Sequence, residues 1–468
     1  MRVSDSNGLL GERRVEARLK QALACSEADE TEVVFSAGSE ALTRFAHNTI
    51  HQNVAERDAS VEVRAALGRR VGRAATNDIS PWGIECAVRR ACEIARHLPE
   101  NPDWPGLPGP QLVSTAAAAY DQAVAEMTPE ARARAVGEIC RAARGARLFA
   151  SGAFSTAQGE YAVLNSKGLF AYAPRTETDL TFVVEQPETS ASAYAQATGW
   201  RLSQINFEAL QAKAVRQALA GRQPQRVKPD EYPVVLEPYA VLTLLEALAA
   251  DGMGALAVQE DRSWMNRRLG RPSLSPRLSI YDDAFDPDGL PQAFDCEGVP
   301  KQRVPIVVNG VPTSPVYDRF TAAREAGKES TGHAQPYDEE DWDGPLPENL
   351  ALAPGEMTMG EMIQAVDHGL YVSRLWYVNL LTPHDGGVTG TTRDGVWWIE
   401  KGELAQPVEN MRFDESLVRA LRQVRGVGRE QATLAGLYGA HRVPALTLES
   451  LRFIDVDDEP WPAGEDQA

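Results

Sequence analysis

Two carboxylates, Glu246 and Asp251, lie five residues apart in the stretch 244–252, which reads LLEALAADG. Carboxylate oxygens suit Mg²⁺, Ca²⁺ or Mn²⁺, and they can also transfer protons as general acids or bases. The apolar residues recur at helical spacing, and five residues of a regular helix advance by about 500°, which leaves the two side chains roughly 140° apart. They can share one metal ion only if the helix is distorted. The spacing therefore favours an ion-paired or solvated Glu246 and an Asp251 that ends the helix before Gly252.

Two histidines, His47 and His51, are four residues apart and would form a pair of metal ligands on a helix. The segment around them, RFAHNTIHQNV, contains β-branched residues and asparagines, which favour a strand and a turn. No third ligand is evident beside them. We therefore expect structural histidines here and no metal site.

Two neighbouring tryptophans, Trp397 and Trp398, lie in a predicted strand. Successive side chains of a strand point to opposite faces, so one ring can pack inside the chain while the other reaches a partner protein. We predict that one of them is an interface anchor. The alternative is that both pack within the sheet of this chain.

The composition limits the class of protein. The 468 residues exceed what one core usually holds, so two domains are expected. The net charge of -19, from 47 Lys and Arg against 66 Asp and Glu, argues against nucleic acid or an anionic membrane as partner. No apolar run approaches the roughly 20 residues of a membrane span, and no signal peptide is visible. Five scattered cysteines indicate reduced thiols, so we expect a cytoplasmic protein.

Hydrophobic patterning predicts an α+β fold whose N-terminal α+β domain covers 1–220. A polar, proline-containing linker at 221–232 precedes a β-rich domain at 233–456 with an open antiparallel, barrel-like sheet, and an acidic tail follows at 457–468. The N-terminal domain is expected to contain helices over 9–25, 80–97, 128–143 and 207–220, and strands over 32–37, 41–45, 60–66, 148–165, 169–173 and 178–185. A Gly-Ser-Glu turn at 38–40 is expected to separate the first two strands. The second domain is expected to open with a strand at 234–236 and a helix, and to continue with strands over 278–282, 303–308, 375–381 and 396–399.

Four stretches of this sequence resemble the TldD/PmbA family of peptidases. The zinc subunit of that family carries LLHEAVGHG, where this chain has LLEALAADG, so Glu246, Ala247 and Asp251 occupy the positions of the first histidine, the glutamate and the second histidine. The other stretches are RFAHNTIHQN at 44–53, CEGVPKQR at 296–303 followed by VVNGV at 307–311, and GTTRDGVWWIEKGEL at 390–404. The last is similar to the PmbA branch, also called TldE. No cysteine follows Cys296, whereas the zinc subunit has a late cysteine ligand.

The resemblance implies a catalytically silent subunit without a cofactor of its own. It implies a heterodimer with a TldD-like zinc subunit, and peptides or unfolded polypeptides, including peptide-antibiotic precursors, as substrates. Two alternatives stay open: an independent enzyme with an altered site around Glu246 and Asp251, and a peptide-binding scaffold without proteolysis. Ala247 counts against the independent enzyme because it removes the residue expected to act as general base.

Overall fold

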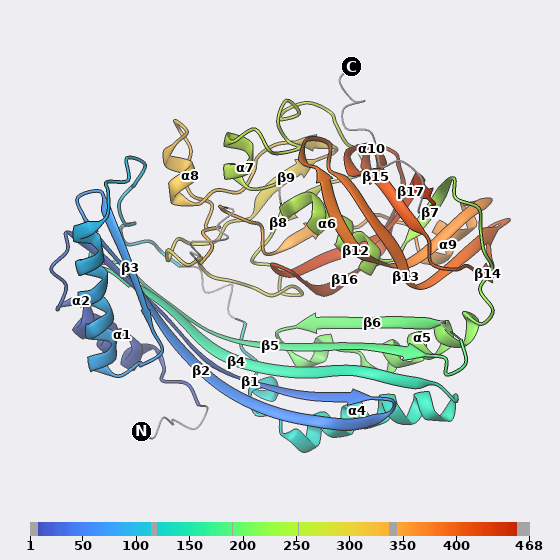
Figure 1. Ribbon diagram of the computed structural model, residues 1–468, viewed down its shortest axis with the longest axis horizontal. Helices are drawn as coiled ribbons and strands as arrows, with labels where there is room; N and C mark the ends of the chain where they lie inside the picture. Colours follow the sequence, from blue (N-terminus) through green and yellow to red (C-terminus); the bar gives the residue numbers. More distant parts are fainter. Residues whose placement is uncertain (1–7, 114–118, 190, 251, 337–343, 456–468) are drawn as a thin grey trace.

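The computed structural model describes residues 8–113, 119–189, 191–250, 252–336 and 344–455. Asp251 and the predicted acidic tail at 457–468 lie outside these residues. Two β-sheets dominate the molecule, as Figure 1 shows: long curved strands of the first half form one layer, and the β-rich second half lies over one face of it. The α+β fold class expected from the sequence is confirmed. The domain boundary at 221–232 stays a prediction, and the first strand of the second sheet begins inside it, at Glu231.

The first sheet has six antiparallel strands in the order β3-β2-β1-β4-β5-β6. The strands are β1 (Glu30–Ala46), β2 (Thr49–Leu67), β3 (Arg70–Thr76), β4 (Phe149–Asn165), β5 (Phe170–Glu185) and β6 (Ser192–Gly199). The strands β1 and β2 form one hairpin whose two-residue turn is His47-Asn48, with positive φ at both residues. The buried Asn48 side chain holds this turn in place, because it donates to the carbonyl of Leu148 and accepts from the N–H of Ala150.

The turn predicted at 38–40 is wrong, since β1 runs without interruption through these residues. Gly38 lies opposite Gly159 on the neighbouring strand β4. A Cβ atom at Gly38 would lie 2.7 Å from the backbone oxygen of Gln158, so glycine is required by close strand contact and not by a turn.

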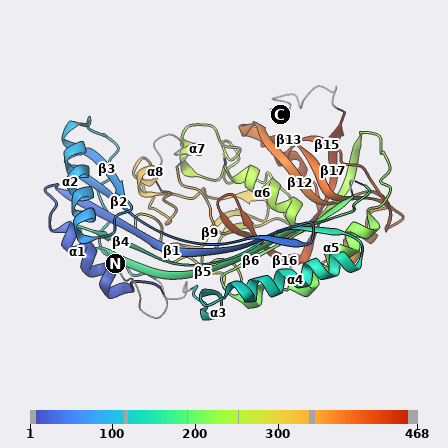
Figure 2. The same ribbon diagram turned by 60° about the horizontal axis from the view of Figure 1, so that its bottom comes forward.

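Longer helices cover the two ends of the outer face of this sheet, and the short helix α3 lies between them (Figure 2). At one end α1 packs on β1 and β4 and α2 packs on β2 and β3, and at the other α4 packs on β1, β2 and β4 and α5 packs on β5 and β6. The starts of α2 and α4 follow from their sequences, because Ser80 and Thr128 each cap a helix that has proline at its first position. The helices of this half are α1 (Glu12–Leu23), α2 (Pro81–His97), α3 (Gln122–Ala125), α4 (Pro129–Gly145), the 3₁₀ turn η2 (Leu202–Gln204) and α5 (Phe207–Ala220).

The second sheet has eleven strands and is mixed rather than purely antiparallel. The strand β7 pairs in parallel with β12, and β11 pairs in parallel with β17. Successive pairings connect β17, β15, β13, β12 and β7, and β7 returns to β17, so this part is ring-like without forming a closed barrel of all strands. The strands are β7 (Glu231–Leu236), β8 (Ile280–Asp282), β9 (Val304–Val308), β10 (Val311–Pro312), β11 (Leu350–Leu352), β12 (His368–Thr382), β13 (Gly387–Glu400), β14 (Glu403–Pro407), β15 (Arg412–Ser416), β16 (Val424–Gly436) and β17 (Gly439–Ile454).

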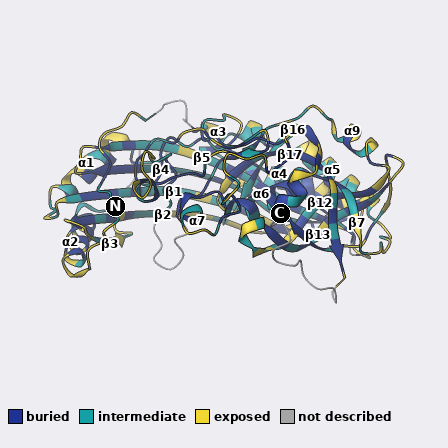
Figure 3. Ribbon diagram, turned by 90° about the horizontal axis from the view of Figure 1, so that it is seen from above, coloured by how far each residue is buried: buried dark blue, intermediate teal, exposed yellow. Residues whose placement is uncertain are grey.

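The largest hydrophobic core lies in this second half, around helix α6 and the strands that surround it. Figure 3 shows buried residues concentrated along the strands and exposed residues mainly on connections and outer helix faces. The helices here are α6 (Pro238–Ala250), α7 (Ala255–Gln259), α8 (Arg319–Ala323), α9 (Met359–Gln364), the 3₁₀ turn η3 (Pro383–Asp385) and α10 (Leu417–Arg422). Within the described ranges, no helix has both the length and the apolarity needed to cross a lipid bilayer.

Candidate functional site

Helix α6 carries the first of the chemical candidates. It follows β7 directly and packs against β12, β16 and β17, with Leu244, Leu245 and Leu248 buried in the main core. Glu246 lies on the part of the helix that is only partly buried, facing the β16–β17 hairpin.

Glu246 stabilises this hairpin through its carboxylate. The backbone N–H of Leu437 donates to Oε1 of Glu246 over 2.5 Å, and Nε2 of His441 lies 3.4 Å from the same oxygen. The other ring nitrogen of His441, Nδ1, accepts from the N–H of Leu350 at 3.1 Å. The ring proton therefore lies on Nε2, toward Glu246, in an electrostatic contact that is too long for a strong hydrogen bond. A Cβ at Gly436 would lie 1.9 Å from Oε1, so glycine makes room for the carboxylate.

Those candidate ligands that the structure describes do not fit a catalytic zinc ion. Glu246 is engaged with the hairpin, Ala247 has no ligand atom, and Asp251 lies outside the described residues. Across the ranges that the structure describes, no three His, Cys, Asp or Glu side chains are grouped so that they could hold a metal. His47 lies in the β1–β2 turn with its ring 5.0 Å from that of Phe149, and His51 is exposed on β2, so the pair belongs to a hairpin and not to a helix.

The structure distinguishes the two tryptophans predicted as interface anchors. Trp397 is only 5% exposed and lies in a small core with Tyr371 and Met362, its ring 5.6 Å from that of Tyr371. Gly395 allows this packing, because a Cβ there would lie 2.6 Å from the Trp397 ring. Trp398 points to the other face, is partly buried, and makes an edge contact with Tyr232 at 5.5 Å. Trp398 is therefore the better placed of the two to reach another protein, and its interface role stays a prediction.

Two exposed aromatic residues on β12 were not singled out from the sequence. Trp376 is 43% exposed and Tyr377 is 77% exposed, beside a register shift in the pairing with β13. Leu437, at the tip of the β16–β17 hairpin, is 81% exposed. Large exposed apolar side chains of this kind are typical of protein interaction surfaces.

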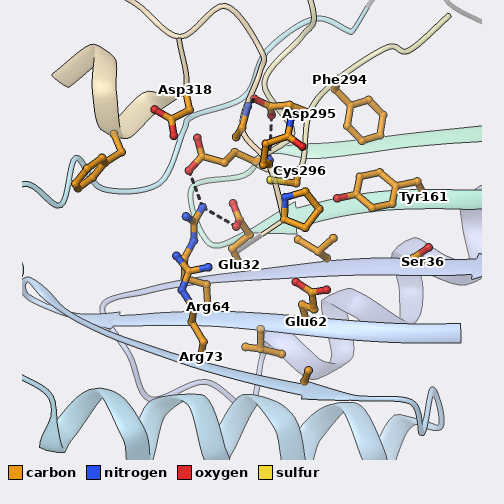
Figure 4. A pocket seen from close by; sticks show the side chains of 18 of the residues that line it. Glu32, Ser36, Glu62, Arg64, Arg73, Tyr161, Phe294, Asp295, Cys296 and Asp318 are labelled. Carbon is orange, nitrogen blue, oxygen red and sulfur yellow. Dashed lines mark hydrogen bonds and ion pairs between the residues drawn. The ribbon is translucent and has the colours of Figure 1, made fainter. Parts of the chain in front are cut away.

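A cavity of about 1000 Å³ lies between one end of the first sheet and loops of the second half. Strands β1 to β5 contribute one wall, and the segments 291–297, 318–320 and 334–336 contribute the other (Figure 4). The stretch 296–303 was recognised in the sequence as a family resemblance but not as part of a cavity. Its partners come from β1 and β2, so only the folded chain brings them together.

Charged side chains meet at the inner wall of this cavity. Arg64 of β2 contacts Oε1 of Glu32 at 2.7 Å and Oε1 of Glu297 at 3.0 Å, both through Nη2. The Arg64 guanidinium also lies over the ring of Trp104, 5.1 Å from its centre. One guanidinium therefore pairs with two carboxylates, and this pairing links the first sheet to the stretch 296–303 of the second half.

The environment disfavours the charged forms of several acids here. Burial raises the pKa of Glu32 to about 7, with the Glu297 charge contributing and the Arg64 charge opposing. Burial and the Glu297 charge raise the pKa of Asp295 to about 8, although backbone N–H groups donate to its carboxylate. Burial also raises the pKa of Asp318 to about 6. Near neutral pH these groups can gain or lose protons when the charge in the cavity changes.

Comparisons with known proteins agree with this architecture. The PmbA/TldA metallopeptidase C-terminal domain matches residues 229–455, and PmbA/TldA metallopeptidase domain 1 matches residues 31–95. The chain is 24% identical to "Metalloprotease PmbA" of Escherichia coli O157:H7 over 452 residues, 93% of this chain and 95% of that protein. It is 28% identical to a "Metalloprotease" of Methanothermobacter thermautotrophicus over 223 residues, 47% of this chain and 46% of that one. The crystal structure of TldE from Thermococcus kodakarensis shares the fold, with a TM-score of 0.84, 20% identity, and coverage of 94% of this chain and 100% of that one.

The fold, with its strand-linked helix α6, and the two matched regions define a metallopeptidase-type protein. The chain belongs to the PmbA/TldD metallopeptidase family, and the resemblance inferred from its sequence is confirmed.

Proposed function

We propose that this chain is a non-catalytic, TldE-like subunit of a heterodimeric zinc metallopeptidase that acts on peptides or unfolded polypeptides. The observation that supports this proposal most directly concerns Glu246 and Ala247, in the stretch that resembles the family's zinc motif. The carboxylate of Glu246 holds the β16–β17 hairpin, and the adjacent Ala247 supplies neither a ligand nor a general base. A family metallopeptidase whose helix lacks these groups needs a second chain that supplies the metal. The zinc is accordingly placed in a TldD-like partner.

The proposal extends to the substrate and the compartment. Maturation of a peptide natural product is one process that such a complex would serve, and the cytoplasm is the compartment that five free cysteines favour. The exposed Trp376 and Tyr377, together with Trp398, are the residues we propose as contacts for the partner. Large aromatic side chains dominate the binding energy of many protein interfaces.

Reconstitution with a zinc-motif paralogue from the same genome tests the proposal. We expect the two chains to elute as one heterodimer and to cleave an unstructured peptide together, while neither chain cleaves it alone. A lone chain that cleaves the peptide would favour the independent enzyme with an altered site around Glu246 and Asp251. Peptide binding without a heterodimer or cleavage would favour the scaffold.

A further inference from the structure

The cavity between the first sheet and the 291–297 segment has an excess of acidic groups. Six carboxylate side chains line it, against three guanidinium groups from Arg64, Arg73 and Arg175. The six are Glu32, Glu62, Asp295, Glu297, Asp318 and Glu348. The nearby Lys301 offsets one of the six carboxylates, because its ammonium pairs with Glu348, and an excess of acidic groups remains.

Two of these carboxylates have an oxygen that the chain leaves without a partner. The Glu32 side chain is 3% exposed and that of Glu297 is 10% exposed, and in both Oε1 contacts Arg64. Among the described residues, neither Oε2 atom has a hydrogen-bond partner. A buried carboxylate oxygen without a partner is costly, and a positively charged donor from the cavity that reaches either atom by displacing neighbouring side chains would offset this cost.

The cavity also has an apolar wall that suits an organic cation better than a metal ion. The rings of Tyr161 and Phe294 stack with their centres 5.8 Å apart, and both line the cavity. Its volume of about 1000 Å³ is at the upper end of ordinary ligand pockets. An aliphatic side chain with a charged end can pack against such rings while its charge reaches the carboxylates.

We propose that this cavity binds the ammonium or guanidinium group of a basic residue in a peptide, with Glu32 and Glu297 receiving the charge and Tyr161 and Phe294 packing against the side chain. That the basic group belongs to a peptide rests on the proposed function, whereas the recognition of a cation rests on the cavity alone. In a working complex, the cavity would select peptides with a basic residue although it contributes no catalytic group.

The ionisation of Glu32 provides a second signature. Its carboxyl, which faces Arg64, Glu297 and Arg73, has a pKa raised by burial to about 7 in the absence of a ligand. A bound cation favours the carboxylate, so binding should release protons near neutral pH, and affinity should increase from pH 6 to pH 8.

The test uses the isolated full chain, so that it does not depend on assembly. Isothermal titration calorimetry would compare a capped peptide with a central lysine to the same peptide with norleucine or glutamate. We expect the lysine peptide to bind at least about tenfold more tightly than either analogue. Equal affinity for lysine and norleucine peptides would overturn the proposal, and so would tight binding of Mg²⁺ or Ca²⁺ alone with no lysine preference.

Substitutions then locate the binding. Glu297→Gln is expected to weaken binding of the lysine peptide about tenfold or more, whereas Glu93→Gln on the exposed face of α2 leaves the affinity unchanged.

In case Glu297→Gln impairs folding, Ala75→Lys provides a second variant, because Ala75 is exposed at the cavity, opposite Glu62 on the neighbouring strand. The added cation should weaken binding of the lysine peptide, and Ala75→Gln, of similar size, should not. If Ala75→Lys and a folded Glu297→Gln both retain full affinity, the cavity is not the site. A chain that fails this test but still forms an active heterodimer loses only this inference, and the proposed function stands.

Discussion

The sequence resemblance aligns Glu246 with a zinc ligand of the family's zinc subunit, and in this chain its carboxylate contacts protein groups. Replacing Glu246 with alanine leaves the N–H of Leu437 without its acceptor and removes the electrostatic contact with His441. We expect the variant to lose about 1–3 kcal/mol of unfolding free energy in urea denaturation. The peptidase activity of the assembled complex should stay within a few-fold of the unmodified complex.

The control for this prediction is Glu93→Ala, because Glu93 is exposed on α2. The same few-fold limit on activity is predicted for Asp251→Ala. A loss of about 100-fold or more in activity with unchanged stability would indicate a metal ligand at Glu246.

The raised pKa of Glu32 predicts an unusual dependence of stability on pH. Between about pH 4.5 and pH 7 the folded chain keeps a proton on Glu32 that the unfolded chain has lost, so this group makes folding less favourable as pH rises. The total effect is up to about 3 kcal/mol. In urea unfolding at pH 5, 6, 7 and 8, Glu32→Gln should reduce the decline of stability with pH. An identical pH slope in the variant would show that Glu32 ionises normally in the folded chain.

The strand β13 presents two tryptophans in different environments, and their substitution separates core from surface. Trp397→Ala should lower the unfolding free energy of the isolated chain by about 3–5 kcal/mol, since the ring is packed against Tyr371 and Met362. Trp398→Ala should cost about 1–2 kcal/mol, because its ring is only partly buried. Thermal or urea unfolding of the isolated variants measures both, and equal losses would mean that the two rings are equally buried.

The exposed aromatic residues of β12 lead to a prediction about assembly. Trp376→Ala and Tyr377→Ala are expected to weaken association with a TldD-like partner about tenfold or more while the melting temperature of the isolated chain changes little. Trp82→Ala is a matched control, since Trp82 is 70% exposed on the distant helix α2. Unchanged affinity in both β12 variants would exclude this part of β12 from the interface.

Local sequence signals predicted some elements closely and others not at all. The helices predicted over 80–97 and 207–220 agree closely with α2 and α5, because the patterning that predicts them lies within the helix itself. The strand β6 was missed because its sequence, SAYAQATG, has few β-branched residues, and its pairing with β5 stabilises it. The parallel pairing of β7 with β12 joins segments more than a hundred residues apart, for which no local pattern exists.

The same reason explains why the cavity could not be predicted as a site. Arg64 and Glu297 are separated by 233 residues, and each is an ordinary charged residue in its local sequence. The resemblance at Glu246, Ala247 and Asp251, in contrast, could be inferred from the sequence because the three residues lie within one stretch. Sequence could not show that Glu246 contacts the β16–β17 hairpin, which lies almost two hundred residues further along the chain.

The whole molecule combines a long first sheet, a β-rich second half of metallopeptidase type and a helix α6 around which the described residues include no group of zinc ligands. Under the proposed function, an enzyme built on this chain depends on a second subunit. Permanent complexes of this kind bury more than about 2,000 Å² in total and have an apolar centre.

The zinc content of each separated subunit tests most directly the proposal that the partner, and not this chain, binds the catalytic zinc. The heterodimer would be purified, its chains separated under mild conditions, and each chain dialysed against a weak chelator before elemental analysis. We predict about one zinc per chain in the TldD-like subunit and well below about 0.1 per chain in this one, because Glu246 is engaged with the β16–β17 hairpin and Ala247 has no ligand atom. About one zinc per copy of this chain, retained after dialysis and removed by substitution of Glu246, would contradict the proposed role.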